Sequence, residues 1–385
     1  MSSLKRFIYV EPHSDSISYL KDESNNSINR RLIRKVQVRL TSYHSALAKD
    51  LALYAYCQPR AFADGADPID KILKEWEQAT AAPSPEFQAL MKTYQAGHAL
   101  YKKRYADHKE LLETGQFVKA ITEALAKFPN LEELEFRDST PASAFTWDQL
   151  ANNPPKLSKC SVMPMGLLDM YKYGLEPEIS FDIAVKILAD MATTKSTIKE
   201  LTFFPETFNI SMSVFKQDIL RNLRDTAKQL EKVVFDCGEY GFQGTVGGEA
   251  EFHQFMSAIL DTDSLVTISV CPRNLERSDP IVGLKMPHAG WPKLESLYLN
   301  GVSMDGDELV RLADSAALQN GMGKEMYVEL YKLNLTGGSW SKVFESLREK
   351  AAEDSAIKKP LGAEDTMPAH WHSVALDRLL IKIPK

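Results

Sequence analysis

A glycine-rich stretch is the part of this sequence whose residue types come nearest to a cofactor site. It reads VVFDCGEYGFQGTVGGEAEFHQF, residues 233–255, and joins a short apolar run, five glycines and the start of a helix. Strand, glycine loop and helix follow one another in phosphate-binding sites. The glycines stand three apart from Gly238 to Gly247 and no lysine follows them, so neither G-x-x-x-x-G-K-[ST] nor G-x-G-x-x-G is present.

The charges around these glycines are also unsuited to phosphate. The nearby ionisable residues are acidic, at Asp236, Glu239, Glu249 and Glu251. They would repel phosphate from the helix N-terminus that should attract it. We therefore interpret Gly238–Gly248 as a flexible connection, with a phosphate cradle as the alternative.

Two further groups of residues contain potential metal ligands or nucleophiles. In His370-Trp371-His372 both histidines would point the same way from a strand, but no Cys or His cluster nearby supplies a third ligand. We favour an aromatic strand edge there. The four cysteines, at positions 57, 160, 237 and 271, form no CxxC pair, and neither G-x-S-x-G nor H-E-x-x-H occurs. The sequence predicts no catalytic residue, no metal site and no cofactor.

The charge balance is that of an acidic globular protein. The 385 residues carry a net charge of −6 with a pI near 5.8, which opposes binding to nucleic acid or to an anionic membrane.

The N-terminus lacks an apolar core of signal-peptide length, and no window approaches the ~18 apolar residues of a membrane span. The isolated cysteines suit a reducing compartment. We expect an intracellular protein, cytoplasmic or nuclear, that is monomeric and binds neither nucleic acid nor membrane.

One local segment departs from this balance. The run Asn29-Arg30-Arg31-Leu32-Ile33-Arg34-Lys35 is basic. It could contact an acidic partner or be the solvated edge of a strand. We favour the edge, because the charge of the whole chain opposes a polyanionic partner.

A repeating pattern gives the elements that position these residues. It consists of an apolar residue, two variable residues, a second apolar residue, one variable residue and a third apolar residue. The copies begin at Leu131, Ile198, Leu230, Leu265, Leu294, Leu330 and Leu376, with weaker copies at Ile33 and Leu157. The last two apolar positions alternate as in a strand, so their side chains share one face.

Stretches with helical apolar spacing accompany these copies. Phe117, Ile121 and Leu125 precede the copy at Leu131, and Phe252–Leu260 precedes the copy at Leu265. The copies recur every ~35 residues, a longer and less regular period than the ~20–29 residues of standard leucine-rich repeats. We predict an α/β fold, an irregular leucine-rich-repeat-like solenoid with parallel strands inside, helices outside and insertions of variable length at the edges.

The first third of the chain has a different pattern. Ser42–Tyr56 and Phe87–Leu112 read as helices, the second long and amphipathic. The open end of a solenoid must be covered. We therefore expect residues 1–115 to form a strand plus a helical N-terminal cap, and residues 116–385 to form the solenoid.

A family resemblance enters at the N-terminus. FIYVEPHSDSISYLKDESNNSINRRLIRKVQVRLTSYH, residues 7–44, resembles the segment that follows the F-box in many fungal F-box proteins, with a short strand, a proline, a helix, a polar turn and a basic-hydrophobic strand. The tyrosine-rich helix Tyr94–Tyr105, the run Phe117–Leu125, the phrase Phe128–Leu134 and the irregular repeat beyond are also similar. The resemblance covers most of the chain.

The resemblance implies the substrate-receptor arm of an SCF-type ubiquitin ligase. An F-box is a helical module, usually N-terminal, with an early Leu-Pro. The chain begins where that module would end, and no equivalent is visible. Docking to the ligase adaptor is therefore not supported, and only the substrate-binding half carries over.

The repeat also indicates where a partner would bind. The residues that alternate with the buried ones point out from the sheet: Glu133, Glu135, Arg137, Thr202, Phe204, Lys232, Asp236, Ser296, Tyr298, Asn300, Lys332, Asn334 and Arg378. Mixed charge with aromatic side chains suits a protein or peptide better than a polyanion, and a merely solvated face is the competing interpretation. We expect a non-catalytic protein-interaction scaffold. The alternative is an enzyme with a site at the Gly238–Gly248 loop or at an insertion edge.

Ligand-dependent stability separates these hypotheses. A ligand at about 100 times its dissociation constant stabilises its folded binder by about 2.7 kcal/mol. For a scaffold we expect no shift of the thermal unfolding midpoint with nucleotides or divalent metals. A nucleotide-induced shift that Gly244→Val abolishes would establish the enzyme instead.

Overall fold

The chain forms a mostly parallel β-sheet with helices packed on it. The computed structural model describes residues 6–41, 43–60, 85–138, 181–194, 197–205, 215–237, 248–272, 282–283, 291–311, 325–350 and 376–384, with the single positions 78 and 81. The strands are β1 (Arg6–Val10), β2 (Ile33–Arg39), β3 (Glu133–Arg137), β4 (Glu200–Phe204), β5 (Lys232–Asp236), β6 (Thr267–Cys271), β7 (Val282–Gly283), β8 (Ser296–Asn300), β9 (Val302–Asp305), β10 (Glu325–Gly337) and β11 (Leu376–Pro384). The helices are α1 (Ser14–Asn25), α2 (Asn29–Leu32), α3 (Ser45–Lys49), α4 (Leu51–Arg60), α6 (Pro85–Glu113), α7 (Gln116–Leu125), α11 (Asp182–Met191), α12 (Gln217–Ala227), α13 (Gly248–Leu260) and α15 (Trp340–Lys350).

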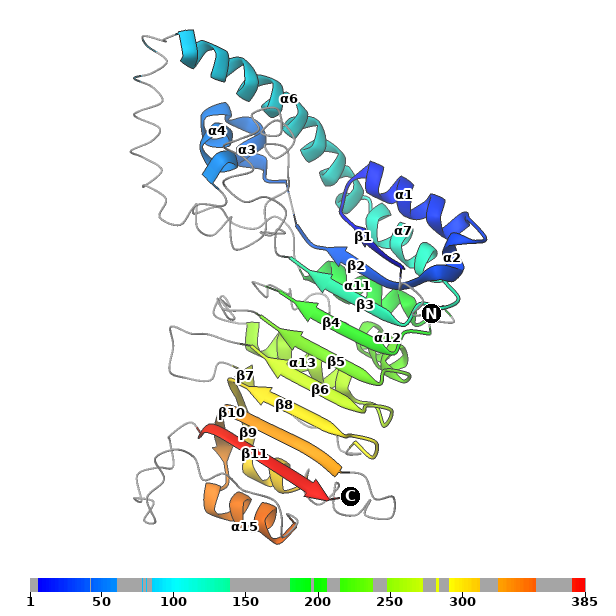
Figure 1. The fold of residues 1–385 in the computed structure, drawn as a ribbon, viewed down its shortest axis with the longest axis vertical. Helices are drawn as coiled ribbons and strands as arrows, with labels where there is room; N and C mark the ends of the chain where they lie inside the picture. Colours follow the sequence, from blue (N-terminus) through cyan, green and yellow to red (C-terminus); the bar gives the residue numbers. More distant parts are fainter. Residues whose placement is uncertain are drawn as a thin grey trace.

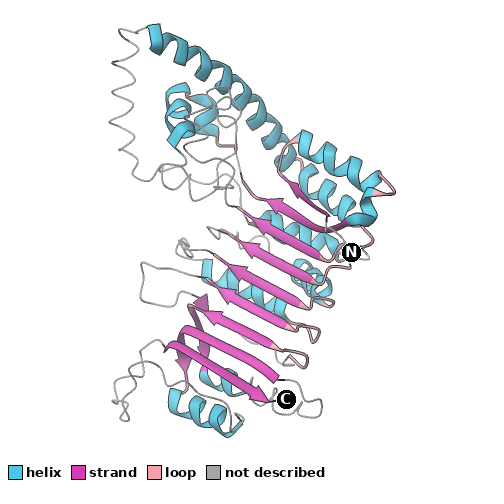
Figure 2. Cartoon of the chain, viewed as in Figure 1, coloured by secondary structure: helices cyan, strands magenta, loops and turns pink. Residues whose placement is uncertain are grey.

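The strands lie side by side in nearly the order in which they occur in the chain (Figure 1). The sheet runs β1-β2-β3-β4-β5-β6-β8-β10-β9-β7, and β11 pairs with β10. Connections between parallel strands are almost always right-handed. When each new strand is added on the same side, such connections leave all their helices on one face. The helices α1, α7, α11, α12 and α13 accordingly form a single layer behind the sheet (Figure 2).

The repeat pattern is confirmed as the source of the core. In register across the sheet, one apolar row runs Val36, Leu134, Leu201, Val233, Ile268, Leu297 and Val328, and a second runs Val38, Phe136, Phe203, Phe235, Val270, Leu299 and Leu330. All of these side chains are buried. The copies that begin at Leu131, Ile198, Leu230, Leu265 and Leu294, and the weak copy at Ile33, all form strands of this sheet.

One predicted copy has a different register. The pattern at Leu330 places Leu333 and Leu335 in the core rows, whereas β10 aligns Val328 and Leu330 with the apolar residues of β8. The apolar run continues because β10 is long and pairs with β9 farther along. In that second segment Leu333 is buried and Leu335 is partly buried, five residues after Val328 and Leu330.

The last copy runs in the opposite direction. The strand that begins at Leu376, β11, pairs antiparallel with β10, whereas we predicted parallel strands throughout. Antiparallel pairs form ladders at least as stable as parallel ones, and an antiparallel edge strand on a parallel sheet is common. The weak copy at Leu157 lies outside the described residues.

Two helices stand where the sequence predicts one over Ser42–Tyr56. Asp50 is extended, and its carboxylate accepts the backbone N–H groups of Ala52 (2.7 Å) and Leu53 (3.0 Å). A short polar side chain that satisfies these N–H groups starts a new helix. The predicted long helix is confirmed as α6. Its His98 Nε2 lies 2.9 Å from the Leu47 carbonyl, which joins α6 to α3.

Aromatic rings connect neighbouring repeats inside the core. Phe203 stacks on Phe136, with ring centroids 5.5 Å apart, and lies 6.0 Å from Phe235 on the next strand. From the helix layer, Phe181 and Phe255 contact the same ring at 5.5 and 5.3 Å. Phe203 therefore holds together three strands and two layers.

Removal of this ring tests its role. We expect Phe203→Ala to lower the free energy of unfolding by about 3–5 kcal/mol, because four rings would line the resulting cavity. Urea denaturation followed by circular dichroism measures the change. The matched control is Tyr19→Ala on the outer side of α1, which should change stability by less than about 0.5 kcal/mol. Equal losses in the two variants would contradict the central position of Phe203.

Candidate functional site

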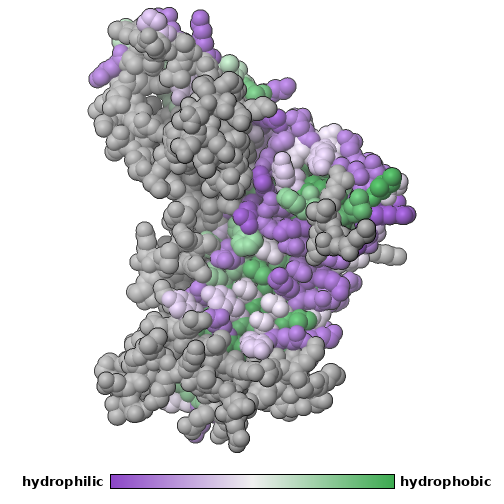
Figure 3. All heavy atoms as spheres, viewed as in Figure 1, coloured by the Kyte–Doolittle hydropathy of each residue, from purple (hydrophilic) through white to green (hydrophobic). Residues whose placement is uncertain are grey.

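The face of the sheet that turns away from the helices is the candidate site, and we call it the open face. Its side chains alternate with the core rows and are Lys35, Gln37, Arg39, Glu133, Glu135, Arg137, Glu200, Thr202, Phe204, Lys232, Val234, Asp236, Thr267, Ser269, Cys271, Ser296, Tyr298, Asn300, Tyr327, Glu329 and Tyr331. Within the described residues no helix covers this face between β3 and β8. Figure 3 shows it, with hydrophilic side chains gathered over the first strands and less polar ones farther along.

The structure brings together ten of the side chains proposed from the sequence. Glu133, Glu135, Arg137, Thr202, Phe204, Lys232, Asp236, Ser296, Tyr298 and Asn300 all belong to the open face. The side chains of Lys332, Asn334 and Arg378 lie outside what the structure describes. On the backbone, Arg378 pairs with Tyr331, and Asn334 pairs with Ser303 of β9, beyond the segment of β10 next to β8.

Sequence reasoning missed three parts of this face. One is β6, where Thr267, Ser269 and Cys271 belong to it. On β2, Lys35, Gln37 and Arg39 belong to it, and the weak copy at Ile33 carried the signal for them through the same alternation. On β10, Tyr327 and Glu329 occupy the two places expected for Lys332 and Asn334, because of the shifted register, and Tyr331 follows them on the same face. Alternation alone could not reveal this shift, since Val328 with Leu330 and Leu333 with Leu335 are both apolar pairs that fit the pattern of a buried strand.

A carboxylate lies at the centre of the N-terminal end of the open face. Glu135 is only 3% exposed. Its oxygens accept hydrogen bonds from Lys35 Nζ (2.6 Å), Gln37 Nε2 (2.5 Å) and Arg137 Nε (3.0 Å). Lys35 also contacts Glu133 at 2.5 Å. The strands β2 and β3 are therefore joined by charged side chains as well as by their backbones.

The ionisation of this cluster follows from its contacts. Burial raises the pKa of Glu135, but hydrogen bonds from Lys35 and Gln37 and the nearby positive charges outweigh burial, so the pKa lies below its ordinary value of 4.5. Burial lowers the pKa of Lys35, and its bonds to Glu133 and Glu135 more than compensate, so that pKa is raised. Both groups are held in their charged forms at neutral pH.

Other charges on the open face are also matched within it. Lys232 pairs with Glu200 at 3.2 Å, and Arg137 lies 4.4 Å from the centre of the Phe204 ring. Arg39 binds Glu11 at 2.9 Å and lies 4.4 Å over the ring of Tyr9. Because these cations have partners in the protein, this end of the face offers no row of free cations for a phosphate backbone.

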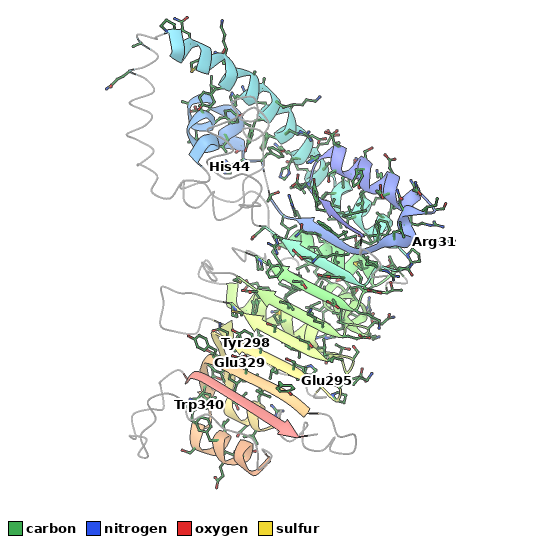
Figure 4. All side chains as sticks on the ribbon, viewed as in Figure 1. Arg31, His44, Glu295, Tyr298, Glu329 and Trp340 are labelled. Atoms are coloured by element: carbon green, nitrogen blue, oxygen red, sulfur yellow. The ribbon has the colours of Figure 1, made fainter. Side chains whose placement is uncertain are left out.

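The far end of the open face is aromatic. Tyr298 is paired in register with Glu329, and Figure 4 labels both on neighbouring strands. Asn300 donates from Nδ2 to the Tyr298 hydroxyl and to Cys271 Sγ, both at 3.2 Å. Tyr327, on the same face, is 52% exposed. Exposed tyrosines over a fixed backbone are typical of protein-binding surfaces.

The described cysteines are poorly placed for nucleophilic chemistry. Cys237 and Cys271 are buried and are not joined in a disulfide, and burial raises the pKa of Cys237 well above its ordinary value, which disfavours the reactive thiolate. Among the residues described, no group of three His, Cys, Asp or Glu side chains is placed to hold a metal ion. The glycines from Gly238 to Gly247 and the His370-Trp371-His372 motif lie outside those residues.

No family model matches this chain, and no curated protein matches it. The resemblance to fungal F-box proteins therefore stays a prediction. Within the described helices, none is long and apolar enough to cross a membrane.

The pH dependence of stability tests the buried carboxylate. A carboxyl group whose pKa is lowered by folding stabilises the protein above its unfolded pKa, and that stabilisation is lost as the pH falls through the folded pKa. We expect Glu135→Gln to be less stable than the wild type by roughly 1.5–3 kcal/mol at pH 7, because bonds from charged donors are weakened. The difference should shrink below about pH 4.5.

Urea denaturation at several pH values measures this difference. The control is Glu123→Gln, an exposed glutamate of α7, which should show no such trend. A stability difference for Glu135→Gln that does not change between pH 7 and pH 3 would contradict the ionised cluster.

Proposed function

We propose that this protein is a non-catalytic interaction scaffold, an irregular leucine-rich-repeat-like solenoid whose open face binds a protein or peptide. The observation that carries the proposal is the one-sided sheet. Within the described residues its helices pack on one face, while the other face carries a continuous run of side chains from β2 to β10, among which Glu135, Thr202, Cys271 and Asn300 are buried. A repeat architecture that leaves one sheet face open provides an extended binding surface.

The chemistry of the open face favours a polypeptide ligand. Several of its charges are paired with one another, as in Lys35 with Glu133 and Lys232 with Glu200. The central strands contribute uncharged groups at Thr267 and Ser269, followed by tyrosines on β8 and β10. Hydroxyl groups next to aromatic rings suit the mixed polar and apolar surface of a protein. A polyanion would instead require unpaired cations.

The resemblance noted in the sequence suggests a more specific role. The chain is similar to the part of fungal F-box proteins that binds substrates, and the open face is the surface that such a role would use. In that role the partner is a protein recruited for modification by a ubiquitin ligase. Uncharged polar and aromatic side chains discriminate among protein partners by shape and hydrogen bonding.

Charge insertion on the open face tests the proposal. Ser269→Arg and Tyr327→Arg place long cations on its central and aromatic parts, and Tyr19→Arg places the same cation on the helix side. We expect proximity labelling in cells to identify a partner set that the two open-face variants lose by at least about tenfold and that Tyr19→Arg retains. Circular dichroism and thermal unfolding confirm that the variants are folded. Partners that the open-face variants retain in full would contradict the proposal.

A further inference from the structure

A second exposed surface lies at the corner between α1 and β2, at the start of the first strands. Ile28 is 70% exposed and Leu32 is 49% exposed. Residues four apart in a helical turn lie on the same side, so these two apolar side chains are neighbours across α2. Arg30 and Arg31 flank them, and Figure 4 labels Arg31 at this edge of the molecule. We call Ile28, Arg30, Arg31 and Leu32 the basic corner.

The backbone of the basic corner is fixed by hydrogen bonds. Asn26 Oδ1 accepts the N–H groups of Ile28 and Asn29, both at 3.0 Å. The N–H of Arg30 donates to the Asn26 carbonyl at 3.0 Å. Asn130 Nδ2 donates to the Arg31 carbonyl at 2.8 Å, which ties the corner to the turn before β3. An exposed apolar pair therefore stands on a preorganised turn, so little conformational entropy would be lost when it binds.

The structure divides the basic sequence run into two functionally different parts. Arg34 pairs with Glu132 at 3.1 Å, and Lys35 with Glu133 at 2.5 Å, so the sheet uses these two cations. Arg30 and Arg31 form no ion pair within the described residues. Lys127, from the end of α7, reaches Asn25 beside the corner at 2.9 Å and adds a further positive charge. Glu23, which accepts a hydrogen bond from Asn29 Nδ2 at 3.2 Å, is buried. The charged side chains of the basic corner itself are both positive, whereas the net charge of the chain is negative.

Exposure of Ile28 contributes nothing to folding, because burial in the core is what stabilises an isoleucine. Arginine is enriched among the residues that contribute most to binding at protein interfaces, and neighbouring exposed apolar side chains mark interaction surfaces. Their charge complement is an acidic surface. We propose that the basic corner binds an acidic amphipathic helix of a partner protein, whose leucines cover Ile28 and Leu32 and whose carboxylates face Arg30 and Arg31. This site is separate from the open face and does not depend on its function.

A labelled peptide tests the proposal with the full chain. The probe is a fluorescein-labelled helical peptide of about 18 residues with leucines at i, i+3, i+4 and i+7 and glutamates flanking them. A peptide with lysines in place of the glutamates is its control. We expect fluorescence anisotropy to show binding of the acidic peptide only, weakened by added salt. Ile28→Ser with Leu32→Ser, and Arg30→Glu with Arg31→Glu, should each reduce the affinity at least about tenfold.

A matched control is available on α6. Leu100 is 45% exposed, and Lys102 and Lys103 beside it are exposed cations. The triple variant Leu100→Ser, Lys102→Glu, Lys103→Glu removes similar groups elsewhere and should leave the affinity unchanged, as should Ser269→Arg on the open face. All variants are checked for folding by circular dichroism.

Three results would overturn the proposal. The first is that the acidic peptide does not bind, or that it binds the corner variants as tightly as the wild-type chain. The second is binding through the corner to phosphatidylserine vesicles but not to the peptide, which would make the surface a membrane site. The third is self-association in sedimentation velocity that the corner variants abolish, which would make the occupant a second copy of the chain.

Discussion

The register between successive parallel strands is the constraint on which the other features depend. The carbonyl that precedes each of the strands β3, β4, β5 and β6 accepts two N–H groups from the start of the next strand in the sheet. Glu132 O binds the N–H groups of Lys199 and Glu200, both at 2.9 Å, and Lys199 O binds those of Glu231 and Lys232 at 2.7 and 3.0 Å. Because side chains alternate along a strand, a slip by one residue would exchange the core row for the open-face row. These backbone bonds therefore set the core and the candidate binding surface together.

Side chains in the turns reinforce the same register. Thr197 donates from its hydroxyl to the Leu131 carbonyl at 2.7 Å, and Ser264 donates to the Leu230 carbonyl at 2.6 Å. Both turns stand just before a strand, at the end where successive repeats must align. At the opposite end, after the strands, the connections are free to differ in length, since loop closure costs little more as a loop grows. This asymmetry accounts for an irregular repeat on a regular sheet.

Electrostatics distinguishes the two candidate surfaces. On the open face, Lys35, Arg39 and Lys232 already have carboxylate partners in the protein, so its recognition would rest on shape, hydroxyl groups and tyrosines. At the basic corner, Arg30 and Arg31 form no ion pair within the described residues, and their charges remain available to an acidic partner. Neither surface includes residues of the other, so the two proposed sites would bind their ligands independently.

Much of the fold was readable from the sequence, because burial leaves a periodic trace. The apolar spacing located β3, β4, β5, β6 and β8, and alternation assigned ten side chains to one face of the sheet. The apolar pattern could not predict the register of β10 or the direction of β11, since an apolar run does not show which strand it pairs with or in which direction. Nor could it show that Arg34 and Lys35 are used by neighbouring glutamates while Arg30 and Arg31 are not. Those glutamates lie ~100 residues away in the chain, and only the packing of β3 against β2 brings them into contact.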